Sequence, residues 1–402
     1  MTPNGGAAAA RLPILLLVIL VGLNLRPFLT AVGPLTADIR ASIGLSLQGL
    51  SLLTLIPMGL MGVLAFVGPT VEAKFGARPA LVAALWAVAG GSLARWFVVD
   101  AEGMFASTVV LSVGVAVAQV VFPGVLKRQF PNGLSTVMGL YSAMLMGGGA
   151  AGARLAPLVA ETIGDWRAGL GLLAAPAALA AIAAALILPR SDRREERAIP
   201  AVGLLRRPRT WLLMACFGLV NGGYSTVVTW LAPFYQERGW SVGSSGTLLA
   251  VMALSQGAAA LLLPMVSRHA RDRRGWLWFT LALQAFGFLG LAAAPDLAPM
   301  IWAVGVGAGL GSSFALTMVV SLDHSPDPAA AGALTAMMQG GGFLLAAVAP
   351  WLVALLHDLS GGYTAGWIMH LGNVMVVACL TTRLAPGTYR RALGMAVPSP
   401  AE

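Results

Sequence analysis

The sequence predicts an all-α membrane protein with twelve transmembrane helices in two pseudo-symmetric six-helix bundles. The first observation behind this prediction is composition: apolar residues make up 58% of the 402-residue chain and charged residues 10%, against roughly 25% charged in a soluble domain. The second is that apolar runs of about 20 residues, long enough to cross a bilayer as a helix, recur along the whole chain. The third is an apolar stretch that occurs twice, once in each half.

Twelve apolar runs define the predicted spanning helices. A helix satisfies its backbone donors and acceptors within its own segment, as hydrocarbon requires, and these runs lack the alternation of a barrel strand. The predicted spans cover residues 12–37, 47–68, 79–97, 103–126, 136–160, 167–188, 210–234, 242–266, 276–294, 299–321, 331–356 and 365–384.

The duplicated stretch is Gly139–Pro157 in the first half and Gly332–Pro350 in the second. The two align without a gap at an offset of 193 residues, and nine of their 19 positions are identical. This self-similarity predicts two bundles, residues 1–189 and 210–402, joined by a cytoplasmic linker over residues 190–209. A duplicated, glycine-rich membrane architecture is typical of two-fold transporters, whose site lies where the halves meet.

Each repeat carries three consecutive glycines, with Gly148 and Gly341 at their centres. Small residues let helix backbones approach one another closely. We expect these glycines to bring the fifth and eleventh spans against helices of the opposite half, on a surface that moves during alternating access.

Basic residues predict the orientation in the membrane. If the N-terminus lies inside, the far side holds only Arg40, Arg95, Arg154, Arg167 and Arg238, and the other lysines and arginines, apart from Arg26 within the first span, face the cytoplasm. This asymmetry predicts a multi-pass inner-membrane protein with both termini in the cytoplasm. The net charge of +9 is then explained by contact with anionic lipid headgroups. A nucleic-acid partner is excluded, because the chain has no basic soluble domain.

The chain shows no pattern of an enzyme. Cys216 and Cys379 lie inside predicted spans, and no nucleophile–base pair, nucleotide-binding loop or metal-ligand spacing occurs. We therefore expect no catalytic site, no metal site and no cofactor, and we expect a monomer.

Arg26 is the most informative single residue. It lies about 21 Å from the start of the first span at a rise of about 1.5 Å per residue, which is too deep for easy contact with headgroups. A guanidinium at such a depth is costly unless it is paired or faces water. We expect it to bind an anion; a buried ion pair or a carbonyl-capped arginine is the alternative. Pro27 follows it, removes a backbone donor and predicts a bend or local unwinding.

The acidic residues favour an anionic substrate, because no predicted span carries a carboxylate at the depth of Arg26. A transporter of organic cations usually needs a buried carboxylate as counter-charge. A guanidinium fork instead suits carboxylate, cyanate, bicarbonate, nitrate or nitro oxygens. Proton coupling would then use the substrate itself or a histidine such as His370.

Further polar side chains inside the spans are candidate substrate contacts: Asn221, Tyr224, Gln119, Ser313 and Gln339. Asn221 and Tyr224 share one face of the seventh span. Gln339 aligns with Met146 in the repeat, a difference expected of a site between unequal halves. For each of these residues, hydrogen bonding between helices is the alternative. Arg154 also leaves two alternatives, lining an outer vestibule or reaching the headgroups.

Short motifs spread over most of the chain carry a family resemblance. They are LNLRP at 23–27, TAVGPL at 30–35, FP at 122–123 and 130–131, GLYS at 139–142, GDWRAGL at 164–170, TWLAPFYQERGWS at 229–241, MMQGGGFLLAAVAP at 337–350 and LLHDLSGGY at 355–363. With these motifs the chain resembles the cyanate and nitroimidazole transporter family of the major facilitator superfamily. The resemblance implies twelve helices, alternating access, and a small anionic or nitro-bearing substrate that contacts Asn24, Arg26, Tyr224 and Gln339.

The segment 68–81 resembles a degraded form of the superfamily's cytoplasmic loop pattern G-x-x-x-D-R-x-G-R-R. Gly76 and Arg78 fit the pattern, Lys74 takes the basic place, and Glu72 stands one position early. The resemblance implies a conformational latch at these four residues. A further departure is SLDHSPDP at 321–328, where family members often carry an arginine.

We therefore expect secondary active or facilitated transport of a small anionic or nitro-bearing solute, cyanate-like or a carboxylate, across the inner membrane. Protons are a candidate coupling ion. Efflux of drugs or metabolites is an alternative, and a non-transporting membrane sensor is the alternative of another class.

Overall fold

The computed structural model describes residues 4–130, 134–189, 202–325 and 327–392. Within these ranges twelve helical segments are long and apolar enough to cross a membrane, and they confirm the twelve predicted spans with ends that differ by a few residues. The first covers Leu12–Ile43 and the last covers Thr364–Thr381.

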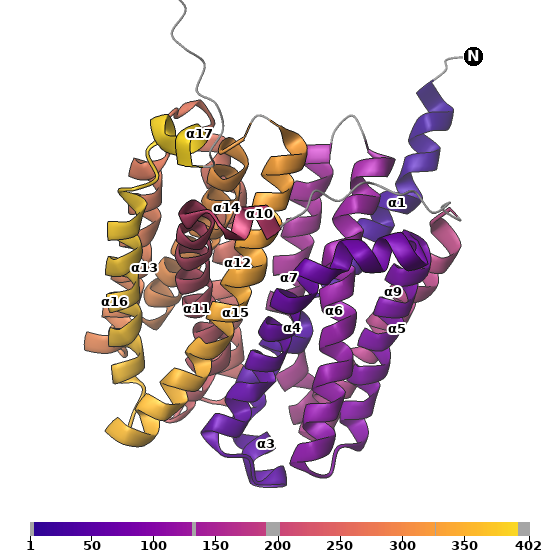
Figure 1. Cartoon of the computed structure of the whole chain (residues 1–402). Coiled ribbons are helices and arrows are strands. Elements are labelled where there is room, and N and C mark those ends of the chain that lie inside the picture. Colours follow the sequence, from indigo (N-terminus) through magenta and orange to yellow (C-terminus); the bar gives the residue numbers. More distant parts are fainter. Residues whose placement is uncertain (1–3, 131–133, 190–201, 326, 393–402) are drawn as a thin grey trace, which may run out of the picture. The chain divides into compact units, whose positions relative to one another are not determined.

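The chain forms two compact units (Figure 1). The first consists of Met1–Glu196 and Val228–Leu254, and the second consists of Arg197–Val227 and Ser255–Glu402. Two long helices therefore contribute to both units, since each changes unit within its length. The division at a linker over residues 190–209, which lies largely outside the described residues, stays a prediction.

Long helices connected by short turns build the first unit. Its helices are α1 (Asn4–Asn24), α2 (Pro27–Thr30), η1 (Gly33–Leu35), α3 (Thr36–Ile43), α4 (Leu47–Phe75), α5 (Ala77–Ala94), η2 (Arg95–Phe97), α6 (Ala101–Gln129), α7 (Leu134–Ile163), α8 (Trp166–Gly171) and α9 (Ala174–Ile187). The Asp100 side chain caps α6 by accepting a 2.8 Å hydrogen bond from the Gly103 amide, which fixes where that helix begins.

The remaining helices of the chain are also mostly long and connected by short segments. They are α10 (Val202–Leu205), α11 (Pro208–Gln236), α12 (Val242–Val266), η3 (Ser267–His269), α13 (Arg274–Ala293), α14 (Pro299–Asp323), α15 (Pro328–Ser360), α16 (Thr364–Thr381), η4 (Pro386–Thr388) and α17 (Tyr389–Ala392). The helices α11 and α12 are the two that contribute to both units.

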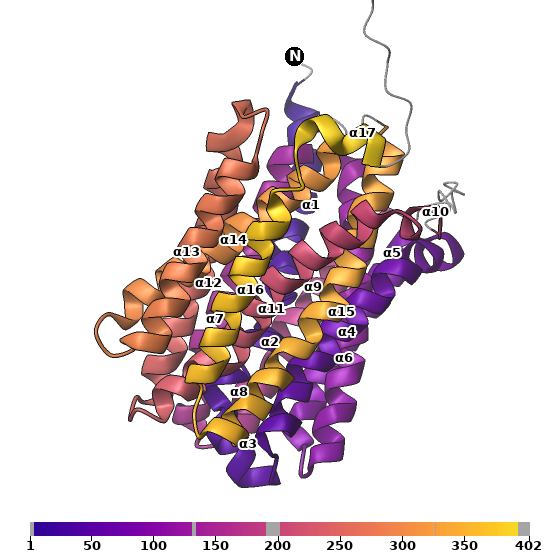
Figure 2. The ribbon, with the colours of Figure 1, turned by 60° about the vertical axis from the view of Figure 1, so that its left-hand side comes forward.

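Equivalent helices have the same neighbours within the two units (Figure 2). In the first unit α5 packs on α6 and α9, and in the second α13 packs on α14 and α16. In the first unit α1 packs on α7. In the second, Gly218 of α11 lies against Gly342 of α15, and the Ser225 hydroxyl of α11 donates a 2.9 Å hydrogen bond to the Ala346 carbonyl of α15. This repeated pattern bears out the predicted pseudo-symmetry.

The first span is broken where the sequence predicts a bend. Helix α1 ends at Asn24, and α2 begins at Pro27, whose ring leaves no amide to continue the helical hydrogen bonding. Arg26 is the residue that precedes α2, with φ −127° and ψ −24°, and its side chain makes no capping hydrogen bond. A second proline, Pro34, follows within η1. The break therefore places Arg26 between two helical pieces of one span.

Candidate functional site

Arg26 is buried at the break in the first span, with 6% of its surface exposed. Its backbone belongs to α2, because the Leu29 and Thr30 amides both donate to the Arg26 carbonyl. Helix α7 packs against the same place: Gly149 faces the Arg26 Cβ, and its carbonyl accepts a 2.6 Å hydrogen bond from the Thr30 hydroxyl. The backbone and Cβ of Arg26 are thus held in the interior of the first unit, at the contact of α2 with α7.

Tyr141 is a site residue that sequence reasoning missed. It is buried in α7, lies within electrostatic range of Arg26, and packs edge-to-face on Phe122 of α6 with ring centroids 5.5 Å apart. Tyr141 is the only tyrosine in residues 1–189, and its counterpart in the repeat is Leu334. The two repeats differ at this position, as they do at Met146 and Gln339. A comparison of the repeats could therefore have identified Tyr141.

Gln119 lies in α6, the helix whose Phe122 packs on Tyr141. It precedes Phe122 by three residues and so shares its helical face. Its amide nitrogen is buried and has no hydrogen-bond partner among the described residues. A buried amide donor without a partner is costly and favours a ligand or a water molecule at that point. Arg26, Tyr141 and Gln119 together offer a guanidinium, a phenol and an amide, three groups that can donate hydrogen bonds to an anion.

Asn24 takes part in packing rather than in this cluster. Its side-chain amide donates hydrogen bonds to the Leu20 carbonyl at 2.8 Å and to the Pro176 carbonyl at 3.1 Å. One amide hydrogen is therefore used within α1, and the other links α1 to α9. This geometry favours the interhelical alternative over the substrate contact that the resemblance implies.

Two candidates of the second unit also have local partners. The Asn221 amide donates back to the Phe217 carbonyl one turn earlier at 2.8 Å. The Ser313 hydroxyl accepts from the Gln284 amide at 2.7 Å and shares a 2.6 Å hydrogen bond with Thr280. Ser313 thereby fastens α14 to α13, which favours its role in interhelical packing.

Tyr224 and Gln339 also belong to the second unit. Tyr224 is buried in α11, whereas Gln339 is half-buried in α15. Their predicted approach to Arg26 stays a prediction. His370 lies in α16 of the same unit, fully buried, with Nε2 2.9 Å from the Thr226 hydroxyl and its ring stacked on Phe288. This arrangement links α16 to α11 and α13.

The segment predicted as a loop at residues 68–81 is mostly helical, which corrects the sequence analysis. Helix α4 continues to Phe75 and α5 begins at Ala77, so that Gly76 alone makes the turn. Gly76 has φ 84° and ψ 152°, a backbone conformation open essentially to glycine. Polar residues after the apolar run did not end the helix, because a helix that leaves the bilayer can continue in water.

The latch residues around Gly76 differ in environment. Lys74 is exposed, with its ammonium 5.5 Å from the centroid of the Phe75 ring. Arg78 is half-buried and donates from Nη2 to the Ala185 carbonyl of α9. The side chain of Glu72 lies outside the residues whose side chains the structure describes. The role of these residues as a latch stays a prediction.

Gly148 and Gly341, the central glycines of the two repeats, contact helices of their own half, contrary to the expectation that they face the opposite half. A Cβ on Gly148 would overlap the carbonyl of Leu23 in α1. A Cβ on Gly341 would lie 2.6 Å from the sulfur of Met214 in α11. The sequence predicted the close approach correctly but not the partner, because glycine spacing does not identify the neighbouring helix.

Arg154 lies on an outward-facing apolar surface of α7. It is exposed, and so are its neighbours Leu155, with 54% of its surface exposed, and Leu158, with 40%. Leu158 follows Arg154 by one turn on the same face. This environment favours a side chain that reaches toward the headgroups.

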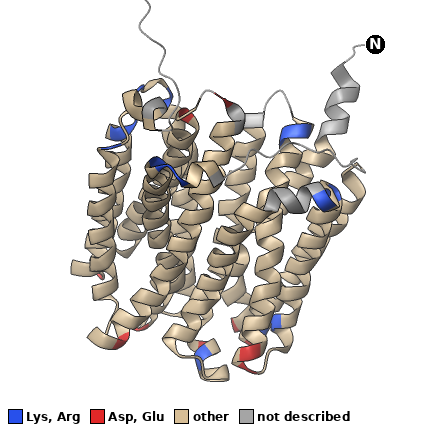
Figure 3. Ribbon diagram, viewed as in Figure 1, with Lys and Arg blue, Asp and Glu red and all other residues tan. Residues whose placement is uncertain are grey.

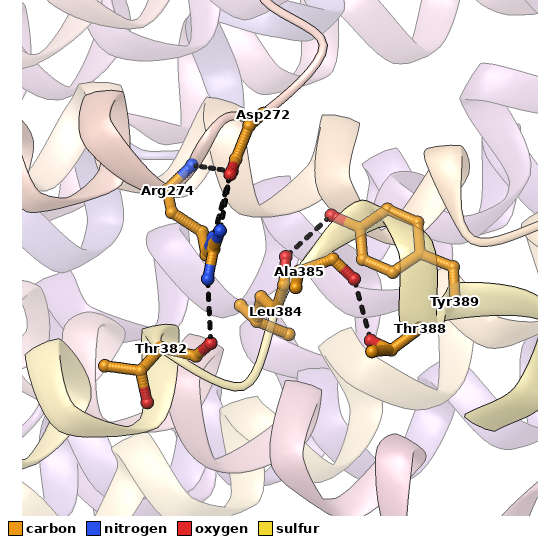
Figure 4. A network of polar contacts seen from close by, with 7 residues as sticks. All are labelled: Asp272, Arg274, Thr382, Leu384, Ala385, Thr388 and Tyr389. Atoms are coloured by element: carbon orange, nitrogen blue, oxygen red, sulfur yellow. Dashed lines mark hydrogen bonds and ion pairs between the residues drawn. The ribbon is translucent and has the colours of Figure 1, made fainter.

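A network of polar contacts fastens the segment after α16 onto the basic end of the second unit (Figures 3 and 4). Arg274 forms an ion pair with Asp272 at 2.6 Å and donates to the Thr382 carbonyl at 3.2 Å. Hydrogen bonds from Arg274 lower the pKa of the Asp272 carboxyl. The Tyr389 hydroxyl donates to the Leu384 carbonyl at 3.1 Å.

His324 continues this network beneath Tyr389. The two rings are stacked, with centroids 3.8 Å apart and planes 15° apart. His324 Nδ1 lies 2.6 Å from the Val320 carbonyl, while Nε2 is buried without a hydrogen-bond partner among the described residues. Burial lowers the pKa of His324 to about 4, so that the stacked ring is neutral at physiological pH.

Comparisons with known proteins agree with this architecture. The sequence profile of the Major Facilitator Superfamily matches residues 14–350. The chain is 40% identical to the cyanate transport protein CynX of Escherichia coli K12, over 93% of this chain and 97% of that protein. It is 29% identical to the 2-nitroimidazole transporter of the same organism, over 90% of this chain and 92% of that protein.

Solved structures share the fold at low sequence identity. The chain matches an inward-facing, unoccupied bacterial homologue of the human lysosomal transporter Spinster with a TM-score of 0.79 and 14% identity, over 99% of this chain and 100% of that one. It matches a D-xylose–proton symporter with a TM-score of 0.76 and 13% identity, over 94% and 98% of the two chains. These matches show the fold alone.

Proposed function

The chain belongs to the Major Facilitator Superfamily and, within it, to the family of the cyanate and 2-nitroimidazole transporters, and from this premise we propose that it transports a small anionic or nitro-bearing solute through a site centred on Arg26. Members of this superfamily are transporters rather than enzymes, and the chain is a multi-pass inner-membrane protein of the same kind.

The buried position of Arg26 at a break in the first span is the observation that carries the proposal. A guanidinium offers a planar fork of N–H donors that binds two oxygens, or one terminal atom from two sides. The energetic cost of its burial is justified if the site must attract negative charge into the membrane interior.

The distribution of carboxylates supports the same conclusion. In the described part of the chain the acidic residues fall in loops, at caps or within the first or last turns of helices, as with Asp38 at the start of α3, Asp323 at the end of α14 and Glu161 near the end of α7. Among the described residues, the middle of the membrane region therefore carries positive charge from arginine and no carboxylate. Such a field favours anions over organic cations.

The names of the two relatives suggest the substrate class. Cyanate is a small linear anion, and a nitroimidazole presents a nitro group with two partially negative oxygens. Both offer a negative end to a guanidinium and a compact apolar or aromatic remainder. We propose that Tyr141 and Gln119 donate further hydrogen bonds to this end, and that Tyr224 and Gln339 contact the substrate from the second unit during alternating access.

The proposed orientation has both termini in the cytoplasm. Arg78, Lys127 and Arg128 lie at the end of the first unit where α5 begins and α6 ends, which is the end where α1 begins. The second unit carries Arg209 and Arg274 where α11 and α13 begin. Under the positive-inside rule these ends face the cytoplasm and contact anionic lipids. We further propose a monomer and leave protons as a candidate coupling ion.

Counterflow in proteoliposomes tests the proposal. Vesicles loaded with unlabelled cyanate are diluted into labelled cyanate, with parallel sets for 2-nitroimidazole and acetate and with protein-free vesicles as control. We expect transient accumulation of at least one of these labels that depends on the loaded solute. Absence of exchange with all three, together with expulsion of a hydrophobic cationic dye, would establish drug efflux instead. Absence of any flux would favour the sensor.

A further inference from the structure

Arg95 is a second buried arginine of the first unit, distinct from the candidate site. It opens η2 at the end of the third span, and its side chain is fully buried, with 0% of its surface exposed. A guanidinium removed from water in this way must be compensated by good hydrogen bonds, or its desolvation penalises the fold. The contacts of Arg95 therefore indicate its role in the structure.

Both hydrogen-bond partners of Arg95 are neutral. Nη1 donates to the Phe28 carbonyl at 3.3 Å, and Nη2 donates to the Thr108 hydroxyl at 3.1 Å. Thr108 is itself oriented by a 2.7 Å hydrogen bond from its hydroxyl to the Met104 carbonyl within α6. Arg95 thus connects one backbone carbonyl of α2 to a fixed side chain of α6.

The carbonyl that Arg95 holds lies two residues after Arg26. Helix α2 has only four residues, too few to be stable by its own hydrogen bonds, so its direction depends on what it contacts. Thr30 and Pro27 attach it to Gly149 and Gly152 of α7. Arg95 attaches its other side to α6. Because the Arg26 carbonyl accepts from the Leu29 and Thr30 amides, any rotation of α2 also moves Arg26.

We propose that Arg95 is a positioning residue, which fixes the orientation of α2 between α6 and α7 and thereby aims the Arg26 guanidinium at the substrate. This inference rests on the proposed function, since the aim of Arg26 matters only if Arg26 binds the transported anion. A fork is suited to the task, because it holds a carbonyl and a hydroxyl on different helices at once, which the single ammonium of a lysine cannot do with the same geometry.

The test measures uptake of labelled cyanate by proteoliposomes, with KM and maximal rate per folded transporter for Arg95→Lys, Arg95→Met and Thr108→Val. Misaiming the cation should raise KM for Arg95→Lys by about tenfold, the equivalent of one hydrogen bond to a charged group, with little change in maximal rate. Thr108→Val should raise it less. The matched control is Arg167→Lys, an arginine of the same unit whose side chain donates hydrogen bonds to Val98, Asp165 and Ser42, which lie outside α2; its KM should be unchanged.

A second measurement separates positioning from a purely structural role. If Arg95 acts through Arg26, Arg95→Lys should add less than about twofold to KM in an Arg26→Lys background, because coupled residues are not additive. The same factor in both backgrounds, or an unchanged KM for both Arg95→Lys and Thr108→Val, would overturn the proposal. If Arg95→Met fails to fold, the KM values of Arg95→Lys and Thr108→Val still test the proposal. An unchanged KM for Arg26→Lys alone would instead overturn the proposed function.

Discussion

The hydroxyl of Thr30 donates a 2.6 Å hydrogen bond to the carbonyl of Gly149 and so joins the broken first span to the glycine-rich α7. One residue earlier, Gly148 lies so close to the Leu23 carbonyl that no side chain fits between them. The first repeat of the glycine motif therefore packs against the break in the first span, where Arg26 lies. The second repeat seats α11 against α15 in the same manner.

The two glycine motifs should differ in their tolerance of alanine. At Gly148 the added Cβ meets the backbone of Leu23, which cannot move aside, and we expect a loss of about 1–3 kcal/mol from overpacking together with loss of transport. At Gly341 the Cβ meets the flexible Met214 side chain, so Gly341→Ala should be tolerated. Thermal unfolding in detergent and uptake by proteoliposomes measure both. A Gly148→Ala variant that is as stable and active as Gly341→Ala and the parent would contradict this expectation and show that α7 can shift away from α1.

The turn at Gly76 should accept only glycine. Its φ of 84° with ψ of 152° is closed to other residues, so Gly76→Asn should cost about 1–3 kcal/mol in unfolding free energy. Gly44 provides the matched control: with φ 67° and ψ 25° it lies in the left-handed region that asparagine tolerates, and Gly44→Asn should cost little. A Gly76→Asn variant as stable as the parent would contradict the single-residue turn.

The segment after α16 should loosen in acid. When it detaches, His324 regains water and a pKa near its ordinary value of 6.5, whereas burial holds the pKa at about 4 when Tyr389 covers the ring. The attached state therefore keeps its full stability above about pH 6.5 and loses it as the pH falls toward 4. Arg209 and Asp323 act on the same imidazole with opposite sign, Arg209 lowering and Asp323 raising its pKa.

A spin label reports this detachment. Gly387 has open space around its Cα, so a cysteine there can carry the label once the exposed Cys379 is replaced by serine. We expect label mobility to rise below pH 6.5. In His324→Phe, which keeps the stacked ring but cannot bind a proton, mobility should not depend on pH. A pH response that persists in His324→Phe would assign the effect to other groups.

Most of the fold could be predicted from the sequence, because apolar runs and prolines act locally. The twelve spans follow from run length alone, and the break at Pro27 follows from a missing amide. Two predictions were wrong: the helices that the repeated glycines contact, and the loop at residues 68–81. The loop at 68–81 was wrong because polarity marks the exit from the membrane and does not mark the end of a helix.

The candidate site was less predictable, because the rotation of each helix decides what a polar side chain contacts. Asn24 and Ser313 are polar residues in spans, yet their hydrogen bonds go to neighbouring helices. Tyr141 was overlooked although it lies within electrostatic range of Arg26, since only its mismatch with Leu334 in the repeat distinguishes it from other aromatic residues in apolar runs. Arg26 itself was recognisable, because the cost of a deep charge does not depend on which neighbour it has.

Calorimetric titration of purified protein with cyanate tests the central claim most directly. The parent is compared with Arg26→Lys, Arg26→Ala and, as control, Arg154→Ala, which alters the exposed arginine of α7. We predict that Arg26→Lys weakens binding by about tenfold or more through loss of the fork, that Arg26→Ala folds but does not bind, and that Arg154→Ala binds as the parent does. Binding by Arg26→Ala as tight as that of the parent would contradict the account and make Arg26 a structural residue.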